Sequence, residues 1–481
     1  MADSRSGGLQ QDLARTGCVD LDLFDFEGGI VRSHDGGFHG NSPWDSWGSV
    51  GPSSRASGPF LPLLIAPLLI ARSGSSVEGF SGRVRPPNDP QRSQRSSPPA
   101  SVPRPGHRGH ATLSVVSHAR SHAVSHARSE RILIYGATGY TGRLVAAEAA
   151  RRGLDAVLAG RDPDRLKAIG ETTGFETRAV VLSDRSRLRA LLEDFAAVLH
   201  VAGPFSETAR PMLDACLEAG THYLDVTGEI TVFEAIARRD AEAKKAGLTL
   251  LPGVGFDIVP SDCLAAWTAA QIEEPSRLRL AIAGMDGGVS RGTARTAIES
   301  LGRGLIIRRN GILETRPPGS LERHFDFGAG PTRGVAMPWG DVATAFHSTG
   351  IPEIEVYLIL SGRMPALLKA SRFAAPLLRR PAVQRFLKAR VEAMPEGPEA
   401  RVRNGTRALL LAEVEGPGDQ LARTLLETPS GYALTPVAAV ECARRVAAGE
   451  APTGFQTPST AFGGDFVLSL PGCVRTDLER E

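Results

Sequence analysis

Three glycines spaced three residues apart could hold the phosphates of a dinucleotide. Gly136, Gly139 and Gly142 follow an apolar run at 132–135 and open a stretch of helical periodicity. The first glycine allows a tight turn, the second lets backbone N–H groups approach a pyrophosphate, and the third lets the helix pack closely on a sheet. The helix N-terminus adds a partial positive charge. We therefore predict coenzyme contacts along the whole turn: Gly136, Ala137, Thr138, Gly139, Tyr140, Thr141 and Gly142.

The choice of coenzyme depends on a residue about 20 positions past this turn. Arg161 stands 19 positions beyond Gly142. An acid there would bond the ribose 2′-OH of NAD, whereas an arginine offers a planar fork to a 2′-phosphate, so the sequence favours NADP over NAD. Two alternatives stay open, namely that Arg161 is a solvated surface charge and that a shift of one residue to Asp162 restores the NAD interpretation. Asp164 is expected to cap the following helix.

Later glycine-bearing loops follow other predicted strands. Ligands of open parallel sheets bind beyond the carboxyl ends of the strands, so the loop with Ala202, Gly203 and Pro204 is expected near the nicotinamide ribose. Candidates for handling the proton that accompanies hydride transfer are Tyr223, Asp225 and Asp257, with His222 and Glu229 as further possibilities. Each has a structural alternative: Tyr223 as a core residue, Asp225 as a brace of its turn, and Asp257 as a helix cap.

The elements that must position these residues alternate between strand-like and helical patterns. Such alternation predicts βαβ units, a parallel sheet and a Rossmann-type, doubly wound α/β fold. The expected strands are 132–135, 156–159, 179–182, 197–202, 223–226 and 248–251. The expected helices are 140–152, 164–169, 186–194, 207–218 and 230–246. Further on, strands are expected at 278–285 and 354–360, a helix at 293–301, and a hairpin whose turn is Asn310-Gly311.

A basic, apolar stretch runs from Met364 to Met394. Its cations are Lys369, Arg372, Arg379, Arg380, Arg385, Lys388 and Arg390. This pattern is typical of a helix on an anionic membrane surface or of a lid over an apolar pocket. It also fits a helical hairpin that packs on its own domain and has a solvated basic face. Pro376 and Pro381 are expected to break it. Charges interrupt every window of about 20 residues, which argues against a spanning helix.

Several separated motifs together resemble one known family. GATGYTG, AGR, VAGPF, HYLDVTGE, PGVGFDIVPSD, GGVSRGT and GFQTPS occur in the order seen in saccharopine dehydrogenase-like oxidoreductases, including the trans-acting enoyl reductase branch associated with glycolipid synthesis. The resemblance implies an NAD(P)-binding Rossmann domain at 131–265, a second, smaller α/β domain at 266–430, and a C-terminal segment at 431–481 that returns to the Rossmann domain. The GATGYTG turn differs from that of true saccharopine reductases, so the resemblance does not imply lysine metabolism.

Three functions remain open, and the basic, apolar stretch favours the first. The first is an NADP-dependent reductase of an unsaturated or carbonyl-bearing, lipid-like substrate. The second is an amino-acid type reductase, for which Arg291, Arg295 and Arg303 are the clustered candidates to hold carboxylates. The third is a scaffold or sensor that binds NADP without turnover. Fold analogy alone does not identify a substrate.

The composition of the chain limits the partners, metal sites and cellular compartment to be expected. With 55 basic against 53 acidic residues the chain is nearly neutral, so no nucleic-acid partner is expected. Five cysteines without a CxxC pair predict a reducing cytoplasm and no metal site. A peripheral contact with the plasma membrane and a homodimer are both compatible with the sequence.

Residues 1–130 differ from the rest of the chain. They are rich in Ser, Gly, Pro and Arg and lack periodicity, which predicts a disordered leader and a mispredicted start. Native peptides preceding Val102, detected by mass spectrometry, would contradict that start. His118, His122 and His126 could meet a metal on a helix, but the surrounding low complexity favours disorder.

Overall fold

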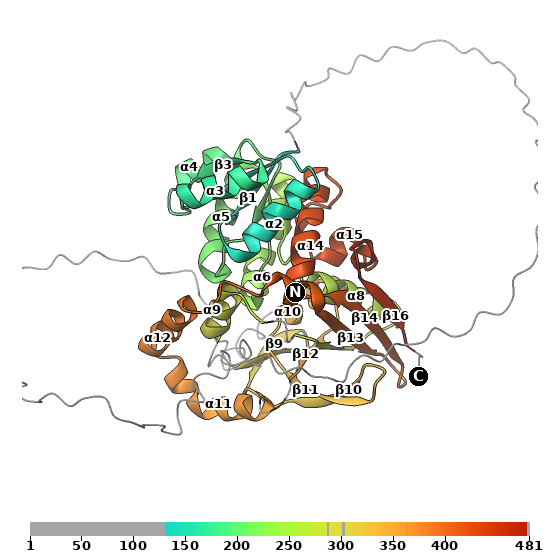
Figure 1. Ribbon diagram of the computed structural model, residues 1–481. Coiled ribbons are helices and arrows are strands. Elements are labelled where there is room, and N and C mark those ends of the chain that lie inside the picture. The colour runs from blue at the N-terminus through green and yellow to red at the C-terminus, as the bar shows by residue number, and fades with distance from the viewer. Residues whose placement is uncertain (1–129, 286–287, 301–303, 361, 363, 479–481) are drawn as a thin grey trace, which may run out of the picture. The chain divides into compact units, whose positions relative to one another are not determined.

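A seven-stranded sheet forms the first half of the structure, a computed structural model that describes residues 130–285, 288–300, 304–360, 362 and 364–478 (Figure 1). The leader up to 129, its three histidines and Arg303 lie outside these residues. The strand order is β15-β6-β5-β4-β1-β2-β3, and every pairing is parallel. The strands are β1 (Ile132–Tyr135), β2 (Ala156–Gly160), β3 (Glu176–Ala179), β4 (Ala197–His200), β5 (His222–Asp225), β6 (Thr249–Leu251) and β15 (Gly454–Phe455).

Buried β-branched and leucine side chains explain the central strands, since a parallel sheet is covered on both faces. The covering helices are α2 (Tyr140–Arg151), α3 (Pro163–Thr173), α4 (Arg185–Leu192), α5 (Phe205–Ala219), α6 (Ile230–Ala237) and α7 (Asp240–Ala246). The order of the strands reverses between β1 and β4, and the carboxyl ends of the strands at such a reversal are where open parallel sheets bind their ligands. The predicted doubly wound α/β fold is confirmed.

Three local predictions were wrong. The strand expected at 179–182 lies at β3 instead, because this edge strand is mostly exposed and polar. The helix expected at 230–246 breaks at Arg238 and Arg239 into α6 and α7. Asp162, not Asp164, caps α3, where its carboxylate accepts a hydrogen bond from the Arg165 N–H at 3.1 Å.

A mixed nine-stranded sheet forms the second half. Its main order is β10-β11-β12-β7-β13-β14-β16, and β8 pairs with both β12 and β9. The strands are β7 (Arg277–Ala283), β8 (Leu305–Arg309), β9 (Ile312–Arg316), β10 (Glu322–Asp326), β11 (Pro331–Ala336), β12 (Glu353–Ile359), β13 (Arg407–Glu415), β14 (Leu421–Pro429) and β16 (Val474–Asp477). The predicted hairpin turn is confirmed, with φ of 49° at Asn310 and 77° at Gly311, as a type I′ turn requires.

The remaining helices surround this second sheet and link it to the first. They are α8 (Val259–Ala269), α9 (Arg291–Ser300), α10 (Asp341–Thr349), α11 (Met364–Leu378), α12 (Pro381–Glu392), α13 (Ala400–Gly405), α14 (Gly431–Ala447), α15 (Pro458–Phe462) and a 3-10 helix, η1 (Phe466–Ser469). Pro381 begins α12 as expected, but Pro376 lies inside α11 and does not break it.

The C-terminal part of the chain contacts the first sheet. Helix α14 packs on α2 (Figure 1). The two residues of β15 extend the sheet beyond β6. One hydrophobic core contains side chains of both sheets, among them Ile134 of β1 and Leu280 of β7. Within the described residues, no helix combines the length and apolar character needed to cross a membrane.

Candidate functional site

The glycine turn between β1 and α2 is shaped by two close approaches of the backbone. Gly136 has φ of 95°, and a Cβ placed there would lie 2.7 Å from the Cβ of Ala202. A Cβ on Gly142 would collide with the carbonyl oxygen of Gly136. Both glycines are therefore required by packing, and the loop after β4 lies directly against the turn at Ala202.

Gly139 has a different environment from its two neighbours. It is the N-cap of α2 and makes no side-chain cap, and the nearest atom to a Cβ placed there would be the carbonyl oxygen of Gly136 at 3.5 Å. Packing therefore tolerates a side chain at 139, and the exposed glycine leaves the helix N-terminus open. This geometry fits a pyrophosphate, because first-turn N–H groups have no partners within a helix.

Arg161 follows the last residue of β2 and is exposed. Among the described residues its guanidinium has no carboxylate partner, unlike Arg143 and Arg165, which both face Glu396. Since Asp162 is engaged at the N-terminus of α3, a shift of register that would make it the ribose ligand is disfavoured. The arrangement therefore fits a 2′-phosphate beside Arg161.

A segment of the second half covers one side of the turn, and we call Met394–Pro398 the strap. The Glu396 carboxylate pairs with Arg143 and lies 3.7 Å from Arg165, and these cations lower the pKa of Glu396. The Tyr140 hydroxyl donates to the carbonyl oxygen of Pro398 at 2.6 Å. Sequence reasoning missed this segment, because nothing in its composition marks it as a partner of residues about 250 positions earlier.

The loop after β4 is held by a half-buried acid, Glu229. The Gly203–Pro204 peptide bond is cis. The backbone N–H groups of Phe205 and Ser206 donate to the Glu229 carboxylate at 2.9 and 3.0 Å. The carboxylate thereby caps the N-terminus of α5. Burial raises the pKa of Glu229, although these hydrogen bonds oppose the rise. Glu229 thus fixes the segment predicted to face the nicotinamide ribose.

Tyr223 and Asp225 form a buried pair at the end of β5. Neither is exposed, and the Tyr223 hydroxyl donates to Asp225 Oδ2 at 2.6 Å. Asp225 Oδ1 accepts from the N–H groups of Thr227 and Gly253, at 2.9 and 3.0 Å. Burial raises the pKa of Asp225 to about 6. The pair joins the loops after β5 and β6, and its predicted part in catalysis stays a prediction.

Asp257 belongs to the loop that follows β6 and faces Gly228 in the loop that follows β5. A Cβ on Gly228 would lie 3.0 Å from Asp257 Oδ2, and the described residues offer the carboxyl no hydrogen-bond partner. Burial raises its pKa to about 6. A carboxyl without a fixed partner and with a raised pKa is a candidate proton donor.

Tyr432, in the first turn of α14, is a residue that sequence reasoning missed. Its hydroxyl oxygen accepts a hydrogen bond from the Ser290 N–H at 2.7 Å and bonds the Thr293 hydroxyl at 2.9 Å. Its ring meets that of Tyr140 edge-on, with centroids 5.3 Å apart. Burial raises the pKa of Tyr432, and the charge of Asp257 adds to the rise. Tyr432 therefore connects the glycine turn with the surroundings of Asp257.

The arginines considered for an amino-acid substrate already have partners. Arg291 donates to the carbonyl oxygen of Met394 at 2.7 Å, and Arg295 pairs with Glu392. Arg303 lies outside the described residues. The structure therefore does not bring the three together as a carboxylate site.

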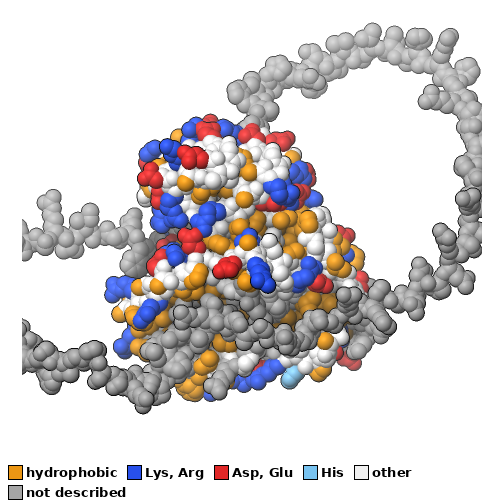
Figure 2. All heavy atoms as spheres, viewed as in Figure 1, with side chains coloured by type: hydrophobic (Ala, Val, Ile, Leu, Met, Phe, Trp, Pro, Cys, Tyr) orange, Lys and Arg blue, Asp and Glu red, His pale blue; other side chains and the backbone are white. Residues whose placement is uncertain are grey.

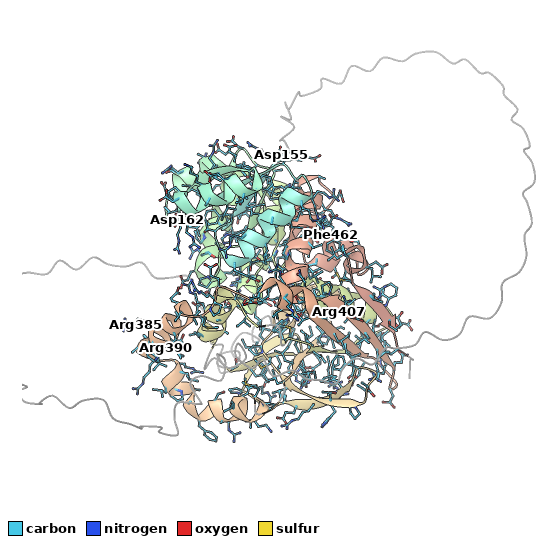
Figure 3. The ribbon with its side chains drawn as sticks, in the orientation of Figure 1. Asp155, Asp162, Arg385, Arg390, Arg407 and Phe462 are labelled. Carbon is cyan, nitrogen blue, oxygen red and sulfur yellow. The ribbon has the colours of Figure 1, made fainter. Side chains whose placement is uncertain are left out.

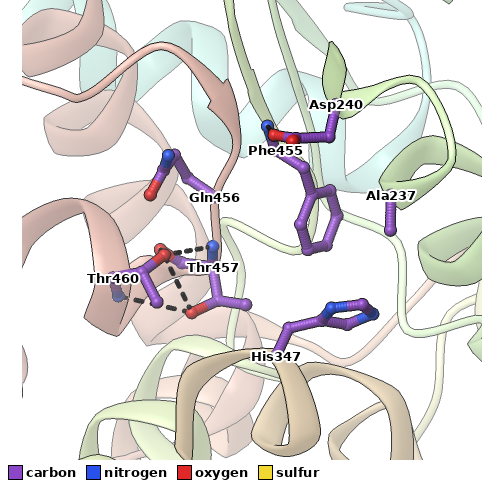
Figure 4. Close-up of a pocket in the computed structure, with 7 residues that line it drawn as sticks. All are labelled: Ala237, Asp240, His347, Phe455, Gln456, Thr457 and Thr460. Atoms are coloured by element: carbon purple, nitrogen blue, oxygen red, sulfur yellow. Dashed lines mark hydrogen bonds between the residues drawn. The ribbon is translucent and has the colours of Figure 1, made fainter. Parts of the chain in front are cut away.

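A separate pocket of about 300 Å³ lies beside β15 (Figure 4). It is lined by Ala237, Asp240, His347, Phe455, Gln456, Thr457 and Thr460. Asp240 accepts from the Phe455 N–H at 2.9 Å, so its carboxylate joins the C-terminal strand to α7. None of the residues predicted to bind coenzyme or transfer a proton lines this pocket.

Comparison with known proteins finds similarity over part of the chain. The saccharopine dehydrogenase NADP binding domain family matches residues 132–251. A trans-acting enoyl reductase from Mycobacterium ulcerans is 36% identical over 140 residues, which cover 27% of this chain and 33% of that protein. A protein of Mycobacterium tuberculosis named for the same activity is 34% identical over 183 residues, or 35% of this chain and 44% of that protein. The chain thus matches less than half the length of these relatives.

A solved structure shares the wider fold. Apo saccharopine dehydrogenase (L-Glu forming) from Saccharomyces cerevisiae aligns with a TM-score of 0.50 and 11% identity, over 73% of this chain and all of that one. The likeness therefore extends past the glycine turn into the second sheet, as a likeness of fold. Residues 132–251 therefore match a family of NADP-binding domains, and the open turn and Arg161 lie within the matched residues.

Proposed function

We propose that this protein is an NADP-dependent oxidoreductase that transfers a hydride to an unsaturated or carbonyl-bearing, lipid-like substrate, as a trans-acting enoyl reductase would in glycolipid synthesis. The observation that carries the proposal is the open N-terminus of α2 at Gly139, beside an arginine with no carboxylate partner in the described chain. The names of the mycobacterial relatives support the enoyl class of substrate.

Different residues around the turn would bind different parts of the coenzyme. First-turn N–H groups of α2 would hold the pyrophosphate, and Arg161 would hold the 2′-phosphate. The loop Ala202–Pro204, fixed through Glu229, would orient the nicotinamide end. The coenzyme supplies the hydride, which adds to one carbon of the substrate double bond. A proton must then reach the other carbon, or the oxygen of a carbonyl.

We propose Asp257 as the source of this proton, ahead of Tyr223 and Asp225. Asp257 has no hydrogen-bond partner within the described chain and its raised pKa lets it carry a proton near neutral pH. Tyr223 and Asp225 are occupied with each other, so they would instead position the loop at Gly253. Tyr432 would orient the substrate from the opposite side, through its contacts with Thr293 and Tyr140.

An amino-acid type reductase is the less favoured alternative, because Arg291 and Arg295 already have partners. A scaffold that holds NADP without turnover is the third possibility. Oxidation of NADPH by the full chain separates the three, measured with enoyl thioesters of different chain length and with a panel of 2-oxo acids. Turnover that rises with acyl length supports the proposal, turnover only with oxo acids supports the alternative, and coenzyme binding without turnover supports the scaffold.

A further inference from the structure

Helices α11 and α12 carry apolar side chains that face away from the protein. Phe373 is 77% exposed and Phe386 is 55% exposed, and Leu377 lies one helical turn from Phe373 on the same side of α11. Each of these two helices thus exposes a phenylalanine that is not part of the protein's own core. Such patches mark sites of contact with another surface.

Arginines surround these apolar side chains. We call the outer face the exposed set made of Arg372, Phe373, Leu377, Arg379, Arg380, Arg385, Phe386 and Arg390. It contains five cations. The exposed acid Glu392, two helical turns beyond Arg385, pairs with Arg295. Lys369 lies one helical turn before Phe373 and pairs with Glu322 at 2.9 Å, and Lys388 pairs with Glu299 at 2.7 Å.

Each exposed phenylalanine has a guanidinium beside it. The Arg372 guanidinium lies 4.6 Å from the ring centroid of Phe373, and that of Arg390 lies 5.3 Å from the ring centroid of Phe386. Figure 2 shows cationic and hydrophobic side chains next to each other along this side of the molecule. The two helices therefore present the same combination of an apolar ring and an adjacent positive charge.

The opposite side of the hairpin holds it on the protein. Leu378, Leu387 and Val391 are buried against Ala294 and Ile298 of α9. In Figure 3, Arg385 and Arg390 project from α12 away from the body of the chain. The hairpin therefore packs through one side while the outer face stays available, and its residues can be changed without disturbing the core.

We propose that the outer face docks the protein on an anionic lipid bilayer. The phenylalanine rings and Leu377 would enter the boundary between headgroups and acyl chains, and the arginines would contact lipid phosphates. A duplex nucleic acid would use the charges but not the exposed rings. The inference does not depend on the proposed reaction, although it would bring the protein to the surface where a lipid-like substrate resides.

Flotation of the full chain with vesicles tests the proposal. Vesicles of phosphatidylcholine alone are compared with vesicles containing phosphatidylglycerol, at low and at high salt. We expect binding only to the anionic vesicles, weakened by salt. Arg385→Ala with Arg390→Ala should lower the partition coefficient by about 25-fold, since each basic residue contributes about fivefold. Phe373→Ala with Phe386→Ala should lower it by at least about tenfold.

Matched controls keep the test specific. Arg187→Ala with Lys245→Ala removes the same charge from exposed positions on α4 and α7, and should bind vesicles as the unchanged protein does. Circular dichroism of every variant establishes that it folds. The proposal is overturned if the unchanged chain does not float with anionic vesicles, if it binds neutral vesicles equally, or if the outer-face variants behave like the control.

Discussion

At the scale of single residues, the glycine turn uses one residue type for two purposes. Gly136 and Gly142 are glycines because neighbouring backbone leaves no room for a Cβ, whereas the space around Gly139 would accept one. A glycine that packing does not require is explained by a ligand that must come close. Each glycine of the motif can therefore be tested separately for its effect on stability and on coenzyme binding.

Gly139→Ala should leave the free energy of unfolding unchanged within about 0.5 kcal/mol. It should weaken NADPH binding by about tenfold or more, because a methyl group would keep the pyrophosphate from charge-assisted hydrogen bonds worth about 1.5–3 kcal/mol each. Gly142→Ala is the contrasting variant and should lower stability, since its methyl group collides with a backbone carbonyl. Thermal melting and coenzyme titration measure both, and unchanged affinity in Gly139→Ala would contradict the assigned role.

Arg161→Ala should raise the Kd for NADPH by about 10- to 100-fold, the equivalent of one or two charged hydrogen bonds. The Kd for NADH should not change, because NADH lacks the 2′-phosphate. Fluorescence titration with both coenzymes checks this prediction. Equal weakening of both would assign Arg161 to the shared part of the coenzyme, and no change in either would leave it a surface charge.

Asp257 gives a prediction for the pH dependence of turnover. Its pKa is raised to about 6, so the protonated acid predominates below about pH 6 and is lost as pH rises. If Asp257 donates the proton, kcat should fall above that pH. Asp257→Asn should abolish this fall of kcat with rising pH, which we call the alkaline limb of the pH profile, and should lower kcat by about 100-fold. Tyr223→Phe should keep the limb, and a limb that survives in Asp257→Asn would point to another donor.

At the scale of elements, the strap brings the second half of the chain to the coenzyme turn. Glu396 occupies Arg143 and approaches Arg165, two cations on the helices that follow β1 and β2. A carboxylate on these arginines competes with coenzyme phosphates for the same charge. Binding of coenzyme and the position of the strap should therefore be linked.

Glu396→Gln should tighten NADPH binding by up to about fivefold, because a half-exposed ion pair contributes about 0.2–1 kcal/mol and would no longer need to be broken. Glu399→Gln changes an exposed acid three residues away and should have no effect. Calorimetric titration of the two variants measures the difference. Weaker binding by Glu396→Gln would mean that the strap holds the arginines in place for the coenzyme.

At the scale of the whole molecule, the sequence predicted those features that depend on interactions between residues close together in the chain. The glycine turn, the Asn310-Gly311 hairpin and the buried central strands follow from short-range rules, and all are present. The edge strand β3 was misplaced because an exposed edge does not need an apolar pattern. Pro376 was expected to end a helix, but it lies on the exposed side of α11, where water can satisfy the carbonyl it leaves unpaired.

The parts of the site that sequence reasoning missed depend on distant contacts. Tyr432 touches Tyr140 and Ser290, and Glu396 touches Arg143, across separations that no periodicity records. Both residues come late in the chain and reach the glycine turn only through the folded structure. A motif search restricted to residues 131–265 therefore finds the glycine turn and Asp257 but not Tyr432 or Glu396.

The pairing of β15 with β6 also bears on how the protein is made. Gly454 meets Thr249, a separation of 205 residues along the chain. At a synthesis rate of about 5–20 residues per second, roughly 10–40 s pass on the ribosome between the emergence of the two partners. During that interval β6 is an unfinished edge of the nascent coenzyme sheet, open to mispairing with other chains. Completion of the seven-stranded sheet thus has to wait for a segment that is synthesised about 200 residues after β6.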